Sequence, residues 1–341
     1  MEQSYPQGAH FRSRGATGRA TLIVMRLDRH DEFQELTDVQ RGVITRQQAL
    51  SFGLTPDAIN WLVHSERWLL LRRGCYSTVT GELPREATLW AAVLSARTGA
   101  VLSHQTAAEL FKITDRQSSL IHVTIPGGRH IARLQGVVVH RCTRLAEAKH
   151  PSLLPPRTRI EETVLDLVAQ AATFDAAFAV VCAACQRRRT TPGKLAEVMG
   201  RRKKMRWRVE LRVALADIGS GVHSLLEYKY VRDVERPHGL PQAIRQARIA
   251  RDGGKAFLDN LYDGHGLCVE LDGREAHPDD RRWRDIRRSN EVAVEGIATL
   301  RYSWSDVDRR PCQTAEQIGA ALKRRGWTGR VRRCGPSCRL P

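Results

Sequence analysis

Three acidic residues in the last third of the chain have the types and spacing of a divalent-metal site. A strand predicted over residues 267–273 carries Glu270 and Asp272 on one face, because side chains alternate along a strand. A short turn joins it to an earlier strand that carries Asp259, so the hairpin can bring Asp259 beside Glu270. Such hard oxygen ligands suit magnesium or manganese, and His277 could serve as a base or proton carrier.

The local charge indicates what this arrangement could do. Residues 257–306 hold eleven acids against seven arginines, although the chain as a whole is basic. Carboxylates repel a nucleic acid unless a cation lies between them, so this acidic stretch favours a metal-dependent nuclease. The alternative is that the acids pair with arginines. Arg281, Arg284 and Arg288 repeat with Asp285 at helical spacing and would form a salt-bridged helix face.

The net charge points to a polyanionic partner. Lys and Arg number 55 against 37 Asp and Glu, which gives +18 and a pI of about 10.2. Most of the excess lies in residues 186–212 and 321–341. The first of these contains Arg202, Lys203 and Lys204, which we expect on nucleic-acid phosphates. A solvated surface is the alternative, and neither stretch shows the amphipathic pattern of a membrane-binding helix.

Two short helices with a tight turn are predicted near the start of the chain. Thr45 and Gln48 have the spacing of a capping box that opens a helix over residues 46–52. Gly53 ends that helix, and Thr55 followed by a proline opens a second helix that extends to residue 66. This pattern is typical of a helix-turn-helix.

The next residues predict a strand, a basic turn and a second strand over residues 68–76, which would form the wing of a winged helix. In such modules the second helix enters the major groove and the wing touches the adjacent backbone. The residues expected to contact DNA are Asp57, Asn60, His64 and Arg67 on the helix, and Arg72 and Arg73 on the wing. The alternative is a winged helix used only for protein contacts.

The remaining histidines and cysteines give weaker signals. His104, His122 and His140 lie far apart in the sequence, so we expect isolated core or surface residues. Cys182 and Cys185 have redox or zinc spacing but no obvious second ligand pair, which Cys334 and Cys338 could supply only through a long-range contact. No secretory signal is visible, so we expect reduced thiols in a cytoplasmic protein.

The length of 341 residues predicts more than one domain. The longest apolar run, residues 176–185, is too short to span a bilayer, so no membrane partner is expected. We predict an α+β multidomain chain. Its segments are an arm or early start codon (1–30), a winged helix-turn-helix (31–81), an α/β middle domain (82–185), a basic linker (186–212), a mixed α/β domain (213–310) and a basic tail (311–341).

The stretch 224–306 resembles the family of very-short-patch-repair (Vsr) endonuclease-like domains. The resemblance rests on the motifs "SLLE", "GLP", "FLDNLYDGHGLCVELDGREAH" and "RWRDIRRSNEVAVEGIATLRYSW". It implies a restriction-endonuclease-like α/β/α fold in which Asp259, Glu270 and Asp272 hold Mg²⁺, His277 is the catalytic histidine and Glu227 is the helix acid. Many relatives have lysine at the position of Asp272, so this chain departs from the pattern there.

The motif "GVITRQQALSFGLTPDAINWLVHSERWLLLRRGCYS" resembles the winged-helix domain of AbiEi-type antitoxins of type IV toxin-antitoxin systems. The resemblance implies binding to promoter DNA, repression of the protein's own operon and a cognate toxin as a partner. The leading hypothesis is a protein that binds double-stranded DNA and carries a Mg²⁺-dependent endonuclease domain. The alternatives are a non-catalytic repressor or antitoxin, in which the nuclease fold is a binding platform, and an RNA-binding protein.

Overall fold

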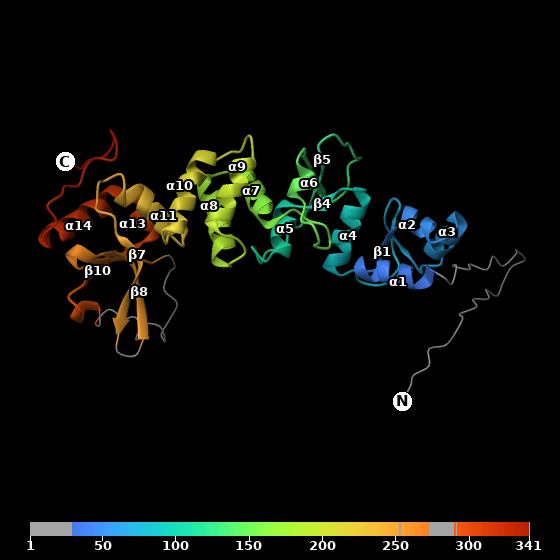
Figure 1. Ribbon diagram of the computed structural model, residues 1–341, viewed down its shortest axis with the longest axis horizontal. Coiled ribbons are helices and arrows are strands. Elements are labelled where there is room, and N and C mark those ends of the chain that lie inside the picture. The colour runs from blue at the N-terminus through green and yellow to red at the C-terminus, as the bar shows by residue number, and fades with distance from the viewer. Residues whose placement is uncertain (1–28, 252–253, 273–289, 291, 341) are drawn as a thin grey trace, which may run out of the picture. The chain divides into compact units, whose positions relative to one another are not determined.

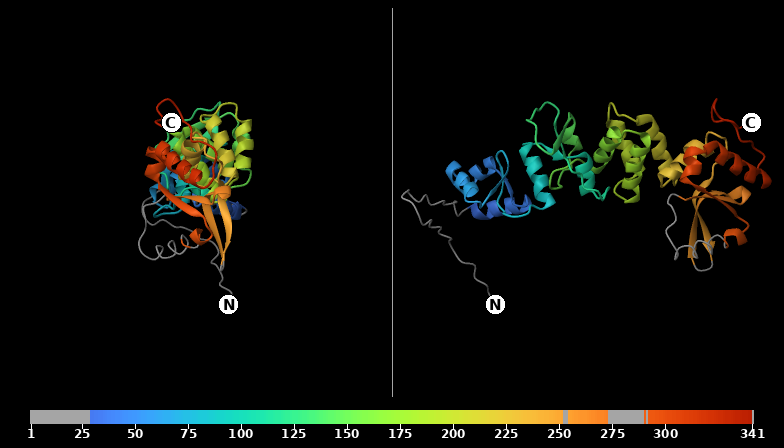
Figure 2. Two further views of the ribbon diagram at one scale, coloured as in Figure 1. Left: turned by 90° about the vertical axis from the view of Figure 1, so that its left-hand side faces the viewer. Right: turned by 180° about the vertical axis from the view of Figure 1, so that it is seen from behind.

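The computed structural model describes residues 29–251, 254–272, 290 and 292–340. The chain is mixed α/β and divides into two compact units, residues 1–163 and 164–341. Their elements are labelled in Figure 1, and Figure 2 shows them from two further sides. This boundary falls inside the stretch predicted as a middle domain. Within the described residues, no helix combines the length and apolar character that a membrane span needs.

The first unit opens with three helices and a small sheet. The elements are α1 (His30–Val39), β1 (Val43–Thr45), α2 (Arg46–Ser51), α3 (Pro56–His64), β2 (Leu69–Arg72) and β3 (Cys75–Ser77). The predicted capping box is confirmed, because the Thr45 hydroxyl accepts from the Gln48 N–H at 3.2 Å and the Gln48 side chain accepts from the Thr45 N–H at 2.9 Å. Thr55 caps α3 in the same way, accepting from the Ala58 N–H at 3.1 Å.

An apolar core fixes these helices on the sheet. The sheet has the order β1-β3-β2 with antiparallel pairing throughout. Its core contains Phe33, Ile44, Ile59, Trp68 and Tyr76, and the rings of Phe33 and Trp68 stack with centroids 6.5 Å apart. Because α3 buries Ile59 in this core, the opposite face of that helix points to solvent.

The rest of the first unit is built around a second sheet. Its elements are α4 (Arg85–Ser95), β4 (Val101–Leu102), α5 (His104–Leu110), β5 (Ile121–Pro126), β6 (Val137–Cys142) and α6 (Leu145–Ala148), and α7 (Ile160–Gln170) crosses the boundary. The sheet order is β4-β5-β6, with β5 and β6 parallel. Trp90 of α4 packs with Val43 and Cys75, while Leu89 packs with the second sheet. This shared helix joins the two sheets into one unit.

The second unit starts with helices where the sequence predicted a linker. Its helical elements before the sheet are α8 (Phe174–Gln186), α9 (Pro192–Arg201), α10 (Arg208–Gly219), α11 (Leu225–Lys229) and the π-helix η2 (Tyr230–Glu235). The stretch 186–212 therefore holds α9 and the beginning of α10, and Leu195 and Met199 are buried there. The many basic residues made the helical spacing of the apolar residues hard to recognise in the sequence. They occupy the outer faces of helices whose inner faces are apolar.

The sheet of the second unit joins an antiparallel meander to one parallel strand. The strands are β7 (Ile244–Arg251), β8 (Gly254–Tyr262), β9 (Leu267–Asp272) and β10 (Ala298–Ser303), with a 3₁₀ turn over Asp263–His265. Their order is β10-β9-β8-β7, and only the β9–β10 pair is parallel. The helices α13 (Trp304–Arg309) and α14 (Pro311–Arg324) follow, so half of the predicted basic tail is helical. Figure 1 shows α11, α13 and α14 together on one side of the sheet.

A candidate acidic site and a candidate nucleic-acid interface

Asp259 lies where β8 parts from β9. The backbone pairing of these strands ends at Asn260 and Val269, whereas β8 remains paired with β7 beyond that point. One carboxylate oxygen of Asp259 accepts from the Leu271 N–H at 3.2 Å, and the other accepts from the Gln246 side chain at 3.3 Å. The carboxylate thus takes the place of the missing strand pairing. Gln246 has φ of 47°, an unusual value for a residue other than glycine, so the backbone is distorted opposite Asp259.

Glu270 is buried beside a cation on the neighbouring strand. The parallel register places Glu270 opposite Arg301 of β10, and a carboxylate oxygen of Glu270 lies 3.1 Å from the Arg301 guanidinium. Asp272, two residues further along β9, is exposed and lies opposite Ser303. The sequence alternative, in which the acids pair with arginines, therefore holds for Glu270. Its partner in the described part of the chain is Arg301, whereas the sequence suggested the arginines at 281, 284 and 288.

Glu227 approaches Asp259 from a helix. It is buried in the first turn of α11, where its carboxylate accepts from the His223 N–H at 2.9 Å and from the Ser224 hydroxyl at 3.0 Å. Burial raises the pKa of Glu227, and the negative charge of Asp259 raises it further.

The acids do not form a preformed magnesium site. Carboxylate oxygens are the ligands that Mg²⁺ takes, so the residue types fit. In the described residues, however, Asp259, Glu270, Asp272 and Glu227 are not among the groups whose ligand atoms all lie within 4.8 Å of one another. The Glu270 carboxylate is moreover already paired with Arg301. His277, and the arginines predicted at 281, 284 and 288, lie outside the described residues.

The outer face of α3 and the turn after it present the predicted DNA-contacting residues to solvent. Asn60, His64 and Arg67 are exposed, and the Arg67 guanidinium lies over the half-exposed Trp61 ring, 5.2 Å from its centroid. On the hairpin, only one of the two predicted arginines is exposed. Arg73 is exposed, whereas Arg72 donates to the Gln135 carbonyl at 2.8 Å. The interface expected from the sequence is therefore accessible along α3 and at the tip of the hairpin.

The predicted phosphate contacts at residues 202–204 are not equivalent. The Arg202 side chain is only 13% exposed and lies 2.8 Å from the carboxylate of Asp166, a residue of α7. Lys203 and Lys204 are exposed. This geometry opposes a phosphate contact by Arg202 and leaves the two lysines able to make one.

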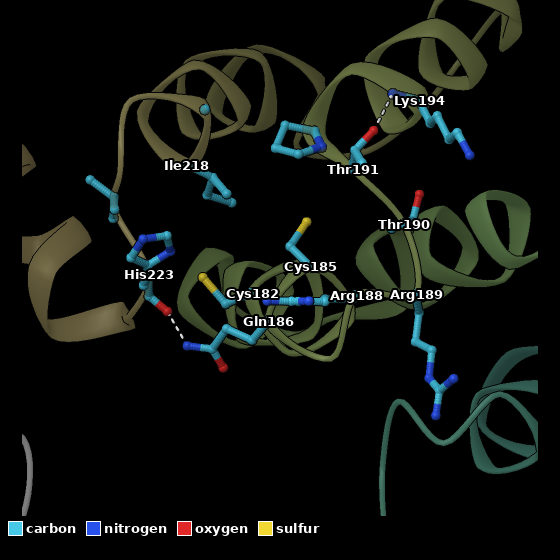
Figure 3. Close-up of a pocket in the computed structure, with 13 residues that line it drawn as sticks. Cys182, Cys185, Gln186, Arg188, Arg189, Thr190, Thr191, Lys194, Ile218 and His223 are labelled. Carbon is cyan, nitrogen blue, oxygen red and sulfur yellow. Dashed lines mark hydrogen bonds between the residues drawn. The ribbon is translucent and has the colours of Figure 1, made fainter. Parts of the chain in front are cut away.

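Cys182 and Cys185 line a cavity of about 800 Å³ in the second unit (Figure 3). The cavity is bordered by α8, by the first turn of α9 and by His223, and its basic lining residues are Arg188, Arg189 and Lys194. Burial raises the pKa of the Cys182 thiol to about 12 and also raises that of Cys185. A neutral thiol is a poor nucleophile, which opposes a redox use. Among the described residues, Cys182 and Cys185 also do not belong to a group of three or more ligands close enough to share an ion.

The expectation that His104, His122 and His140 are isolated is wrong. They belong to α5, β5 and β6, and the parallel register of β5 and β6 brings them together. A hydrogen bond joins His122 Nδ1 to His140 Nε2 at 3.0 Å, and the His104 and His140 rings stack with centroids 3.7 Å apart. Near-parallel rings at this spacing do not aim their in-plane lone pairs at a common point, so stacking opposes shared metal binding.

This histidine stack predicts a loss of stability in acid. Burial and, to a smaller extent, the neighbouring His122 lower the pKa of His140 to about 4. The unfolded state therefore binds the proton first, so the stabilisation is complete above pH 6.5 and is lost as pH falls toward 4. We expect His140→Gln to remove about 1–2 kcal/mol of the pH dependence of the free energy of unfolding. This is less than the full pKa shift implies at about 1.36 kcal/mol per pKa unit, because the ring is partly exposed and solvent screens its charge.

Urea unfolding of the wild type and His140→Gln across this pH range measures the difference. The control is His30→Gln, because His30 is exposed on α1 and lies outside the stack. Equal pH dependence in the wild type and His140→Gln would contradict the prediction.

Comparison of the chain with protein-family models and with curated proteins gave no match. Sequence reasoning did not anticipate Gln246 or Arg301 as neighbours of the acids. For Arg301, alternation along residues 298–303 offered a signal, since a strand there beside β9 places every second residue on the face that carries Glu270.

Proposed function

We propose that the chain binds duplex DNA through α3 and the β2–β3 hairpin, acting as a winged helix-turn-helix. The observation that carries the proposal is the division of α3 into two faces. Ala58 and Ile59 are buried in the core, while Asn60 and His64 are exposed on the outer side, and Arg67 is exposed in the turn that follows the helix. A helix held in this way can enter the major groove and present polar side chains to base edges.

The proposed contacts differ in what they contribute. Asn60 can pair with an adenine edge and Arg67 with guanine, so these residues would specify the sequence. Arg73 at the hairpin tip and the exposed Lys203 and Lys204 would contact phosphates, which adds affinity without selectivity. A regulator that recognises an operator is the role that best matches such a division.

Selection from a pool of random duplexes, followed by binding measurements on the selected sequence, tests this proposal. We expect Asn60→Ala/Arg67→Ala to weaken binding to the selected duplex at least about 10-fold, since one base contact is worth about 1–3 kcal/mol. Glu35→Ala, at an exposed position on α1, is the control. Failure of the wild type to enrich any sequence, or unchanged binding by the double variant, would refute the proposal. So would equal competition by structured RNA at about 150 mM salt.

A second candidate function, metal-dependent DNA cleavage by the second unit, is favoured by the position of Asp259 and Glu227. The order α11, β7, β8, β9, then a parallel β10, is the order of a restriction-endonuclease-like core, the fold that the Vsr resemblance implies. In such a core, Asp259 at the strand fork and Glu227 on the helix would be two of the catalytic acids. The Glu270–Arg301 ion pair supports the opposing, non-catalytic alternative, in which the domain serves as a binding platform.

Plasmid nicking in the presence of Mg²⁺ separates these alternatives. If the unit is a nuclease, the wild type nicks the plasmid and Asp259→Ala/Glu270→Ala loses the activity. Asp263→Ala, at an exposed acid in the turn before β9, is the matched control and should nick like the wild type. Equal nicking by the wild type and the double variant, or no nicking by either, would rule out the acidic site as a cleavage centre.

A further inference from the structure

Three cysteines and one histidine from distant parts of the chain converge at the end of the second unit. They are His238, Cys312, Cys334 and Cys338, and their ligand atoms all lie within 4.8 Å of one another. His238 follows η2, Cys312 lies in the first turn of α14, and the other two lie in the terminal segment after α14. More than 70 residues separate His238 from Cys312, so tertiary folding alone brings this set together.

The distances match a tetrahedral metal centre. Zinc–sulfur bonds of about 2.3 Å at tetrahedral angles place sulfurs about 3.8 Å apart. Cys312 Sγ lies 3.7 Å from Cys334 Sγ and 3.6 Å from Cys338 Sγ. Cys338 Sγ lies 4.0 Å from His238 Nε2. The four donors therefore already have nearly the separations that a shared ion requires.

The histidine is oriented as metal-binding histidines are. His238 is fully buried, and its Nδ1 lies 2.8 Å from the Val234 carbonyl. Donation of the Nδ1 proton to this carbonyl places the lone pair on Nε2, the nitrogen that faces Cys338. Such a second hydrogen bond fixes the tautomer and the direction of a ligating imidazole.

The segment that carries Cys334 and Cys338 lacks regular structure but is nevertheless held in place. After α14 the described segment forms no helix or strand up to residue 340, yet Cys338 and Leu340 are buried. The Arg332 N–H donates to the His238 carbonyl at 3.0 Å, and Arg333 donates to the Leu340 carbonyl at 2.7 Å. A short segment with so little apolar core is typically stabilised by a metal or a disulfide.

A disulfide explains the cluster less well. It would join two of the three sulfurs and leave the third thiol and the buried imidazole without a role. All three cysteines are free thiols in this structure. One ion would use all four donors, and four protein ligands leave no open position, which is the mark of a structural rather than a catalytic zinc site.

We propose that His238, Cys312, Cys334 and Cys338 bind one structural Zn²⁺ that fastens the carboxyl-terminal segment to the end of η2 and the start of α14. Zinc suits this mixed thiolate and imidazole set, whereas magnesium does not. The site is independent of the acidic cluster, since it uses none of the same residues. Loss of zinc would release the segment after α14 while leaving the sheet in place.

Metal analysis of the full-length chain, purified under reducing conditions and supplied with zinc, tests the proposal. We expect one zinc per chain, and replacement by Co²⁺ should give the strong visible absorption of a tetrahedral thiolate site. Cys312→Ser/Cys334→Ser should lower the zinc content below about a tenth of an equivalent, because too few ligands remain. Cys185→Ser, which removes a thiol that lines the Figure 3 cavity, should leave the metal content unchanged.

A second readout keeps the test valid if the double variant folds poorly. Limited trypsin digestion of the wild type, with and without a zinc chelator, reports on the segment that contains Arg330, Arg332 and Arg333. We expect chelation to speed cleavage there at least about 10-fold, without comparable cleavage in the sheet. Absence of zinc and cobalt binding in the wild type would overturn the proposal. Equal metal content in the double variant, or a Cys312–Cys334 disulfide in the purified chain, would do so as well.

Discussion

Arg245→Ala is expected to lower the free energy of unfolding of the second unit by about 3–5 kcal/mol. Arg245 of β7 and Glu235 of η2 are both 5% exposed and form a bidentate ion pair. Arg245 also donates to the Asn260 side chain at 2.8 Å. The Tyr262 hydroxyl lies 3.3 Å from the same Glu235 carboxylate. Alanine would leave that carboxylate buried without its cation, and this desolvated charge is the source of the large cost.

Chemical denaturation of the full chain, followed by a probe in the second unit, measures this effect. The control is Arg248→Ala, which removes an exposed arginine from the same strand and should change stability by less than about 0.5 kcal/mol. Arg245→Met/Glu235→Leu should recover most of the loss, since it removes both charges together. A loss as small as that of the control would show that the ion pair is not energetically important.

The elements of the first unit were largely predictable because their signals are local. A capping box needs only Thr45 and Gln48, and Thr55 with the following proline marks the start of α3. Local hydrogen bonds of this kind act over three or four residues, so the sequence contains the whole interaction. The exposure of Asn60 and His64 follows from the same periodicity.

The neighbours of the acidic residues were harder to predict because they depend on register between distant strands. Asp259 and Glu270 were expected together from one hairpin, and Glu227 was expected near them from the resemblance alone. Arg301 belongs to a strand about thirty residues further along, and its partner is set by a parallel crossover that no local pattern specifies. The position of Asp259 depends in the same way on where the backbone pairing of β8 with β9 ends.

Clusters formed by long-range folding escaped prediction altogether. The His104, His122 and His140 stack requires the pairing of β5 with β6 and the placement of α5 beside them. The cluster of His238 with three cysteines requires that the segment after α14 pack against the end of η2. The spacing of Cys182 and Cys185 resembles that of zinc ligands but came without a second ligand pair, and α8 places both residues in a cavity wall. Sequence spacing identifies metal ligands only when the ligands lie within one local motif.

Ile59→Ala is expected to lower stability and Asn60→Ala to weaken DNA binding, although the two residues are neighbours on α3. Ile59 is completely buried among Phe33, Trp68 and Tyr76, so its truncation removes apolar contacts and leaves a cavity. We expect a loss of about 2–5 kcal/mol in the free energy of unfolding of the first unit. Asn60 is exposed, and its replacement should change that free energy by less than about 0.5 kcal/mol.

The comparison has value because it separates folding from DNA recognition on a single helix. Thermal unfolding gives the stability of each variant, and binding to the selected duplex is then measured at a temperature where both remain folded. Ile59→Ala should bind normally once folded, because its side chain faces the core, whereas Asn60→Ala should bind more weakly at unchanged stability. If both variants lost binding only in proportion to their loss of stability, α3 would be a structural helix. The contact with DNA would then have to be sought at the exposed arginine of the hairpin or at the lysines that precede α10.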